Sequence, residues 1–557
     1  MKWKKRENFS TIKEVVEKNT GMSIEELHRG GSSILHMDEA VKAVSDAIRK
    51  NEPVKIMGDY DCDGVLGGTI LYMALERYIQ MTGSTSKVSV RFPKRFSEGY
   101  GLSEKVVDET DSGMLLCVDN GIAAIDAIKK AKEKGLSVVM LDHHLAKAGI
   151  PAADVIVDPH VYAENGAFLD FCGAHLAYRF AQLLIPSETG LLDKLAVFAG
   201  IATVADVMPI VKDNWLIVRK SLELLDNGIC TRGLAQLAAG MHIEVAVEDD
   251  YGYKIAPAIN ACGRLYDDGP QQAFEVLSED RDLPELPEKA EKLIHINEER
   301  KALARELEKR ADELLSKEIP KNCIVIYDEK FHLGINGIVA GYLTEQYHKP
   351  AIVFSPSDTE NVMKGSGRTY GDINLKALLD ETASCYLGYG GHAGAAGVAA
   401  KTEDLDKIRK ALDKSLEGKV KPPSDELDYD LTITEQEVEN SLDELDRFRP
   451  FGEGNPAPIF RLTNFILSPQ QKGFYRLMGQ EQEHMKLFGK DMDAMLFGNA
   501  SLFEGKGSPK TMEIVGKLSR NYFHGTARNQ IEVLDLKETE KKHTDTYLSF
   551  ADLLNFS

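Results

Sequence analysis

Short apolar runs followed by acidic residues recur along the first 210 residues. Val54–Met57, Leu115–Val118 and Val138–Leu141 have the length and composition of buried strands. Helical apolar spacing precedes the first strand, over 38–50, and recurs between and after the strands, over 65–80, 123–134, 174–184 and 191–205. This alternation predicts a largely parallel sheet with helices on both faces. Ligands of such sheets bind beyond the carboxyl ends of the strands.

The remaining pattern predicts a second α/β unit and a β-rich domain. Residues 286–319 form one long run with opposite charges at helical spacing, as expected of a solvated spacer helix. Short strand-like runs with intervening glycines follow a Pro-containing linker, which predicts a small barrel. The fold class is therefore α/β, with two α/β domains joined by a long helix, plus a C-terminal β-barrel. The expected parts are an N-terminal helical segment (1–50), a first α/β domain (51–285), the helix (286–319), a second α/β domain (320–420), the barrel (425–540) and a tail (541–557).

Carboxylate and imidazole side chains follow all three early strands: Asp59, Asp61 and Asp63, then Asp119, then Asp142, His143 and His144. The first three occupy alternate positions, which point the same way in an extended segment. Crowded carboxylates repel each other unless a cation lies among them, and oxygen and imidazole ligands suit divalent metals. A single Asp after a strand usually forms only a turn. Three such strand ends in succession favour a metal site.

Asp206 is a further candidate ligand, at the end of an apolar helix-like run before Pro209. A helix-terminal Asp is usually at the surface, whereas a buried one needs a partner. Taken alone, the segment favours the surface interpretation. The motifs that precede Asp206 form an ordered set with it, and this favours the interpretation of Asp206 as a ligand.

Composition and charge limit the partners and the cellular location to be expected of the protein. The 557 residues carry a net charge of −21, which argues against extensive wrapping by nucleic acid but allows a local basic channel. No apolar run reaches the length of a membrane span, and the basic N-terminus lacks the apolar stretch of a secretory signal. Seven cysteines are scattered without metal-knuckle or redox spacing, which predicts reduced thiols and a cytoplasmic location.

The ordered motifs resemble those of the DHH phosphoesterase superfamily. They are the segments 58–64, 118–121, 142–144 and 204–206. The glycine-rich run 388–397 resembles the signature of the DHH-associated domain of type 1, DHHA1. Segments 95–102, 260–265, 365–368 and 449–456 extend the resemblance to the bacterial single-stranded-DNA-specific exonucleases of that superfamily, over about residues 35–540.

The resemblance implies 5′-to-3′ hydrolysis of single-stranded DNA to 5′-mononucleotides, with two divalent metal ions, manganese preferred and magnesium possible. Asp61 and Asp63 would each hold a metal, and Asp119 would bridge both. His143 and Asp206 would complete the second metal. Asp59 would be a ligand or support one, and His144 would contact the scissile phosphate. Asp59, Asp119 and His144 are thus the expected catalytic residues.

The remaining implied residues bind DNA. Arg95, Ser366 and Arg368 would hold the 5′-phosphate, and Arg264 and His392 would contact phosphates from opposite walls. Stacking and basic candidates in the barrel are Phe474, Tyr475, Arg476, Lys486, Phe488, Arg520, Tyr522 and Arg528. The implied role is in DNA repair and recombination, by a monomer with no membrane partner. A single-strand-binding protein and a helicase are the partner proteins that the resemblance suggests.

The sequence leaves alternatives open. Met57 stands where some DHH enzymes have a metal-binding His, so water would complete the first metal's ligands. An oligonucleotide or 3′-phosphoadenosine 5′-phosphate phosphatase of the superfamily would lack the barrel, and a pyrophosphatase would lack the Gly-Gly-His segment. A non-catalytic replication scaffold would be expected to lose ligands, whereas this set is intact.

Overall fold

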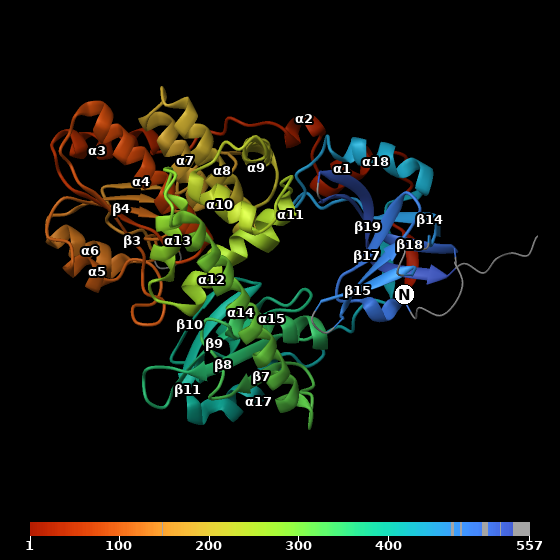
Figure 1. Ribbon diagram of the computed structural model, residues 1–557. Helices are drawn as coiled ribbons and strands as arrows, with labels where there is room; N and C mark the ends of the chain where they lie inside the picture. The colour runs from red at the N-terminus through yellow and green to blue at the C-terminus, as the bar shows by residue number, and fades with distance from the viewer. Residues whose placement is uncertain (147–148, 469–472, 480–481, 504–510, 524, 539–557) are drawn as a thin grey trace, which may run out of the picture. The chain divides into compact units, whose positions relative to one another are not determined.

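The computed structural model describes residues 1–146, 149–468, 473–479, 482–503, 511–523 and 525–538 (Figure 1). The chain divides into two compact units, one of residues 28–424 and one that joins residues 1–27 to the segment from Asp425 onward. The predicted N-terminal segment, 1–50, is thus split between the units, and it opens with a strand rather than a helix. The predicted tail, 541–557, lies outside the described residues.

Five parallel strands form the first sheet, in the order β3-β2-β4-β5-β6. They are β2 (Val54–Met57), β3 (Val88–Arg91), β4 (Met114–Val118), β5 (Ser137–Leu141) and β6 (Val155–Val157). One face packs against α5 (Glu104–Asp108) and α6 (Ile125–Glu133). The other packs against α3 (Met37–Arg49), α4 (Cys62–Thr82) and α7 (Gly173–Leu184) (Figure 1). The predicted parallel sheet with helices on both faces is confirmed.

A helical layer continues the first domain and leads into the second. It contains α8 (Thr189–Ala205), α9 (Lys212–Asp226), α10 (Arg232–Gly240), α11 (Glu248–Asp250), a π-helical turn (Tyr251–Ile255), α12 (Ala256–Leu265), α13 (Gly269–Leu277) and α14 (Leu286–Leu315). The spacer interpretation of α14 is wrong in one respect. Ala304, Leu307, Ala311 and Leu315 form a buried stripe on the second domain, because their spacing places them on one helix face. None of the described helices is long and apolar enough to span a bilayer.

The second sheet has the order β10-β11-β9-β8-β7. Its strands are β7 (Ile324–Tyr327), β8 (Ala351–Pro356), β9 (Val362–Arg368), β10 (Gly388–Gly391) and β11 (Ala395–Lys401). Only the β7–β8 pair is parallel. α16 (Leu375–Glu381) and α17 (Leu405–Ser415) cover one face, while α14 and α15 (Asn336–Tyr347) cover β7 and β8 on the other. Alternate residues of β9 and β11 on that second face are exposed or half-buried.

The smaller unit is built on a seven-stranded sheet of order β13-β14-β18-β19-β17-β16-β15. The strands are β13 (Leu431–Thr434), β14 (Phe460–Ile466), β15 (Tyr475–Met478), β16 (His484–Phe488), β17 (Met492–Leu496), β18 (Thr511–Phe523) and β19 (Thr526–Glu538). A parallel pair of β1 (Lys2–Lys5) and β12 (Glu426–Tyr429) ties the first residues into this unit. Its helices are α1 (Ile12–Thr20), α2 (Ile24–Leu27) and α18 (Val438–Leu445).

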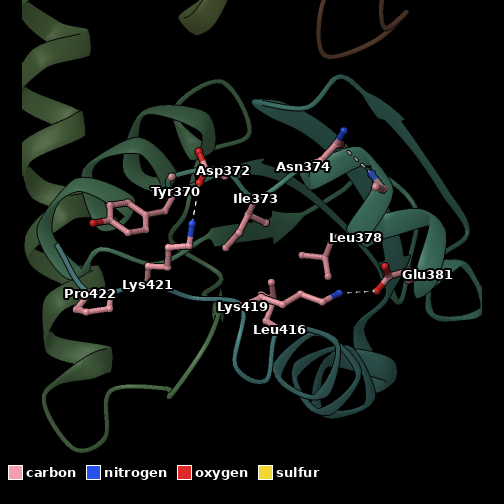
Figure 2. A pocket seen from close by; sticks show the side chains of 12 residues that line it. Tyr370, Asp372, Ile373, Asn374, Leu378, Glu381, Leu416, Lys419, Lys421 and Pro422 are labelled. Carbon is pink, nitrogen blue, oxygen red and sulfur yellow. Dashed lines mark hydrogen bonds and ion pairs between the residues drawn. The ribbon is translucent and has the colours of Figure 1, made fainter. Parts of the chain in front are cut away.

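One cavity of about 400 Å³ lies in the second α/β domain, beside α16 and the segment after α17 (Figure 2). Its floor is apolar, with Ile373 and Leu378, and an ion pair joins Lys421 to Asp372 at its rim. The residues that line it include none of the predicted site residues. The predicted metal-binding residues lie elsewhere, at the carboxyl ends of strands in the first sheet.

Candidate metal centre

The first acidic motif is a strand-to-helix turn. β2 ends at Met57 and α4 begins at Cys62, so Asp59 lies in the turn and Asp63 lies in the first helical turn. Asp61 is the N-cap of α4, because its Oδ1 accepts a hydrogen bond of 3.1 Å from the Gly64 backbone N–H. The expectation that the three aspartates share one extended segment is therefore wrong. The helix turns Asp63 toward different partners.

The structure brings the predicted ligands together in three overlapping groups. In each group one donor atom per residue lies within 4.8 Å of the others: Asp59, Asp61 and Asp119; Asp63, His143 and Asp206; and Asp119, His143 and His144. His143 Nε2 lies 3.1 Å from Asp119 Oδ1 and 3.6 Å from Asp206 Oδ2. It lies 3.7 Å from Asp63 Oδ2. Asp119 belongs to two groups, as a bridging ligand would.

A helix N-terminus fixes the orientation of Asp63. Its carboxylate accepts hydrogen bonds from the backbone N–H groups of Gly173, at 2.6 Å, and Ala174, at 2.8 Å, at the start of α7. These donors and the helix dipole favour the charged carboxylate. Asp206, the C-cap of α8, approaches from the next helix. Gly173 has no assigned role in the sequence motifs, and only the fold brings it to this place.

Asp119 has a left-handed backbone conformation, with φ of 60°. Few residues other than glycine adopt it, and Asp and Asn tolerate it best. The next residue, Asn120, holds the turn by donating hydrogen bonds of 2.9 Å to the carbonyls of Met57 and Val118. A side chain at Gly173 would place its Cβ 2.6 Å from the Asp119 Cβ. Glycine is therefore required at this contact. The Met57 side chain packs in the core and not among the ligands.

These carboxylates are buried close together, so they repel each other unless a cation lies among them. Burial and the neighbouring carboxylates raise the pKa of Asp119 and of Asp59 well above the ordinary value. Asp59 Oδ1 is buried without a hydrogen-bond partner in the described residues. Burial lowers the pKa of His143 to about 3, so its imidazole is neutral and able to ligate a metal. The donor set therefore fits divalent metal ions.

His144 differs from His143 in charge. Although its burial opposes protonation, the hydrogen bond and charge of Asp142 raise the pKa of His144 to about 9. His144 Nδ1 lies 2.8 Å from Asp142 Oδ1, and its Nε2 lies 3.3 Å from the Tyr100 hydroxyl. The Tyr100 hydroxyl also donates to the Asp119 carbonyl at 3.3 Å. The motif analysis gave no role to Asp142 or Tyr100, and the signal for Asp142 was its place beside the two histidines.

The predicted DNA-binding residues divide into those that line a cleft and those that do not. A cleft of about 330 Å³ between the two α/β domains is lined by Arg95 and Ser366, but not by Arg264, Arg368 or His392. Burial and the charges of Arg95 and Arg368 lower the pKa of Arg264 to about 10. These three arginines have no carboxylate ion pair within the described ranges. His392 Nδ1 accepts a hydrogen bond from the Gly394 backbone N–H.

Carboxylates pair with most of the basic residues that were candidates for DNA binding in the β-rich unit. Arg520 contacts three carboxylates, those of Glu439, Asp443 and Asp446. Lys486 and Arg528 lie 2.8 Å and 2.9 Å from the buried carboxylate of Asp493. The predicted local positive groove therefore loses most of its charge, since sequence alone does not reveal the facing acids. The Tyr475 side chain is exposed.

Three family models match separate parts of the chain. The DHH family N-terminal domain matches residues 53–205, the DHHA1 domain matches 321–418, and the RecJ OB domain matches 427–535. The Bacillus subtilis protein named single-stranded-DNA-specific exonuclease RecJ is 30% identical over 518 residues, covering 90% of this chain and 64% of its own length. The chain combines the domains of the RecJ family. The OB match separates it from the shorter phosphatases of the superfamily.

Two further RecJ proteins support the assignment along the chain. Haemophilus influenzae RecJ is 28% identical, with 89% of this chain and 90% of the relative covered. The crystal structure of Thermus thermophilus RecJ in complex with Mn²⁺ is 25% identical and covers 94% of this chain and 76% of that chain, with a TM-score of 0.74. The RecJ fold, with its DHH, DHHA1 and OB domains, and a divalent-metal centre are therefore properties of this chain.

Metal removal should make the stability of this protein depend on pH. Burial and the charge of Asp61 raise the pKa of Asp63 to about 6 from its ordinary 3.8. The folded metal-free protein therefore binds the proton more tightly than the unfolded chain, so its free energy of unfolding should fall as pH rises through about 6. Thermal unfolding with chelator or with Mn²⁺ should show a stabilisation by Mn²⁺ that grows with pH. A pH-independent difference would contradict this.

Proposed function

We propose that this protein is a metal-dependent exonuclease that degrades single-stranded DNA from the 5′ end and releases 5′-mononucleotides. The observation that carries the proposal is the cluster of three overlapping ligand groups, two of which contain Asp119, beside a cleft lined by Arg95 and Ser366. The intact ligand set supports an enzyme rather than a non-catalytic scaffold. The names of the relatives support the substrate class.

Each ligand has a proposed role. Asp59 and Asp61 hold one metal, and Asp63, His143 and Asp206 hold the second, with Asp119 between them. Two bound divalent ions supply activation of water and neutralisation of charge on the attacked phosphate. Manganese is the preferred ion because imidazole completes one ligand group, and magnesium is the alternative.

His144 is the proposed contact to the scissile phosphate. Its Nδ1 is held by Asp142, which leaves Nε2 directed toward Tyr100 at the cleft. A protonated imidazole donates a charge-assisted hydrogen bond to a phosphate oxygen. Asp142 thus serves as the residue that orients His144 and keeps it charged.

Arg95, Ser366 and Arg368 are the proposed pocket for the 5′-phosphate, with Arg264 and His392 on adjoining phosphates. A 5′-phosphorylated strand should then be degraded faster than a 5′-hydroxyl strand. Arg368→Ala should reduce that preference about tenfold or more, since a hydrogen bond to a charged group stabilises by about 1.5–3 kcal/mol. Arg29→Ala, at an exposed position, is the control. Equal loss on both substrates would count against the pocket.

The function is tested with single strands labelled at either end. Release of labelled mononucleotide from the 5′ end, with the 3′ label retained on shortening products, is the expected result. Cleavage within the strand, or loss from the 3′ end first, would refute the proposed polarity. A duplex of the same sequence should resist degradation.

The proposed cellular setting is the cytoplasm. The seven cysteines are free and buried, as expected for a reducing cytoplasm. A monomer acting in DNA repair and recombination, with a single-strand-binding protein and a helicase as partners, is consistent with the proposed activity. Co-purification from cytoplasmic extract and analytical ultracentrifugation test these points.

A further inference from the structure

The carboxylate of Asp267 binds a loop that is distant in the sequence. Asp267 lies between α12 and α13, and its neighbour Asp268 is the N-cap of α13. Asp267 Oδ1 accepts a hydrogen bond of 2.8 Å from the Phe96 backbone N–H. Its Oδ2 accepts one of 2.9 Å from the Ser97 hydroxyl. Both oxygens of one carboxylate thus hold the loop 92–103, which joins β3 to α5.

This loop carries two residues that face the cleft. Arg95 and Tyr100 both line it. Arg95 directly precedes the two residues that Asp267 holds, and its Cζ lies 4.8 Å from the centroid of the Tyr60 ring. The backbone on the C-terminal side of Arg95 is therefore fixed by Asp267.

A second tie holds the loop 92–103 to the strand that precedes it. The Arg91 side chain, at the end of β3, lies 2.8 Å from both carboxylate oxygens of Glu98. Glu98 also accepts a hydrogen bond of 3.0 Å from the Lys94 backbone N–H. These bonds close the loop on itself and on its own strand. Asp267 adds a bond to a different part of the domain.

Asp267 lies where the first α/β domain contacts the second. Arg264, at the end of α12, donates a hydrogen bond of 3.4 Å to the Gly334 carbonyl of the second domain. The Phe96 ring packs edge-on against the His332 imidazole, with ring centroids 5.4 Å apart. The proposed 5′-phosphate pocket takes residues from both domains. Its geometry therefore depends on how the loop is held at this junction.

We propose that Asp267 is a positioning residue, which fixes Arg95 relative to Ser366 of the second domain and thereby sets the preference for a 5′-phosphorylated strand. The inference rests on the proposed function. Asp267 acts through Arg95, because both of its oxygens already bind the loop. A loop that is held in place loses less conformational entropy when its arginine binds a phosphate.

Hydrogen exchange of the full-length protein, without DNA or metal, tests the anchor. Asp267→Ala should raise the exchange rates of amides in residues 94–101 about tenfold or more, because it removes both acceptors. Asp268→Ala is the matched control, since Asp268 is the neighbouring carboxylate and pairs with Gln272 of its own helix. Unchanged exchange in folded Asp267→Ala would overturn the proposal.

Binding of oligothymidylate with and without a 5′-phosphate tests the consequence for the pocket. The ratio of the two affinities, measured by fluorescence anisotropy with chelator present, should fall about threefold to tenfold in Asp267→Ala. Asp267→Asn keeps one acceptor oxygen, so its ratio should lie between those of Asp267→Ala and the wild type. Asp268→Ala should keep the wild-type ratio. Mn²⁺ binding measured by calorimetry should not change in either Asp267 variant.

The double variant Arg95→Ala/Asp267→Ala separates positioning from a general loss of structure. If Asp267 acts through Arg95, adding Asp267→Ala to Arg95→Ala should leave the affinity ratio unchanged. An equal fall in the ratio in both backgrounds would overturn the proposal.

Ser97→Ala decides the matter if Asp267→Ala does not fold, because it removes only the hydroxyl donor from the loop. Exchange rates and an affinity ratio like those of the wild type would then contradict the anchor. A wild type without preference for the 5′-phosphate would refute the proposed pocket. The exchange experiment would still support or overturn the anchor by itself.

Discussion

Asp119→Asn should abolish cleavage of single-stranded DNA while the protein stays folded. The substitution removes the charge shared by two ligand groups, so we expect a loss of about a thousandfold or more, equivalent to about 4 kcal/mol in the barrier. Asn is the appropriate replacement because it tolerates the left-handed conformation that Asp119 adopts. Alanine would add backbone strain to the loss of the ligand.

The measurement is single-turnover cleavage of a 5′-phosphorylated strand, with DNA binding measured in the absence of metal. Binding should change little, because Asp119 is not among the proposed phosphate contacts. Asp126→Asn, at an exposed position on α6, is the matched control. Near-normal turnover by folded Asp119→Asn would contradict the proposed role of Asp119 as a bridging ligand.

Complete chelation should eliminate activity, and Mn²⁺ should restore it better than Zn²⁺. The proposed ligands are carboxylates and one neutral imidazole, with no thiolate among them, and such a set suits Mn²⁺. Mn²⁺ should also raise the melting temperature, because it relieves repulsion among buried carboxylates and binds only the folded site. Exonuclease activity and thermal unfolding of chelated, dialysed protein measure both effects.

Two controls make the metal experiment decisive. Asp119→Asn should show a much smaller rise in melting temperature with Mn²⁺ than the wild type, which ties the stabilisation to this centre. Asp126→Asn should respond like the wild type. Full activity in protein whose metal content is verified as zero would refute metal-dependent cleavage.

The acidic and histidine side chains that the structure gathers could be predicted from the sequence, because their signal is local. Each acidic motif directly follows an apolar strand, and parallel strands bring their carboxyl ends to one edge. The turn into α4 was not predicted, since Asp61 as an N-cap resembles any acidic residue after a strand. The resemblance supplied the division of roles among the ligands, which spacing alone does not determine.

The supporting residues could not be predicted, because they act across long sequence separations. Gly173 contacts Asp119 and donates to Asp63 only after α7 has packed against the sheet. Likewise, the acids that neutralise Arg520 lie more than 70 residues before it. A basic residue in a strand therefore gives no sign, from sequence, of whether its charge is available.

The pairing of β1 with β12 has a consequence for the order of events during synthesis. Lys2 pairs with Glu426, so the first strand has no partner until more than 420 residues have left the ribosome. At about 5–20 residues per second, that wait lasts tens of seconds, during which residues 28–424 can fold as a unit. The smaller unit closes last. In a nascent chain stalled before residue 425, the N-terminal 27 residues should therefore be sensitive to protease, while residues 28–424 with their metal centre should already be folded.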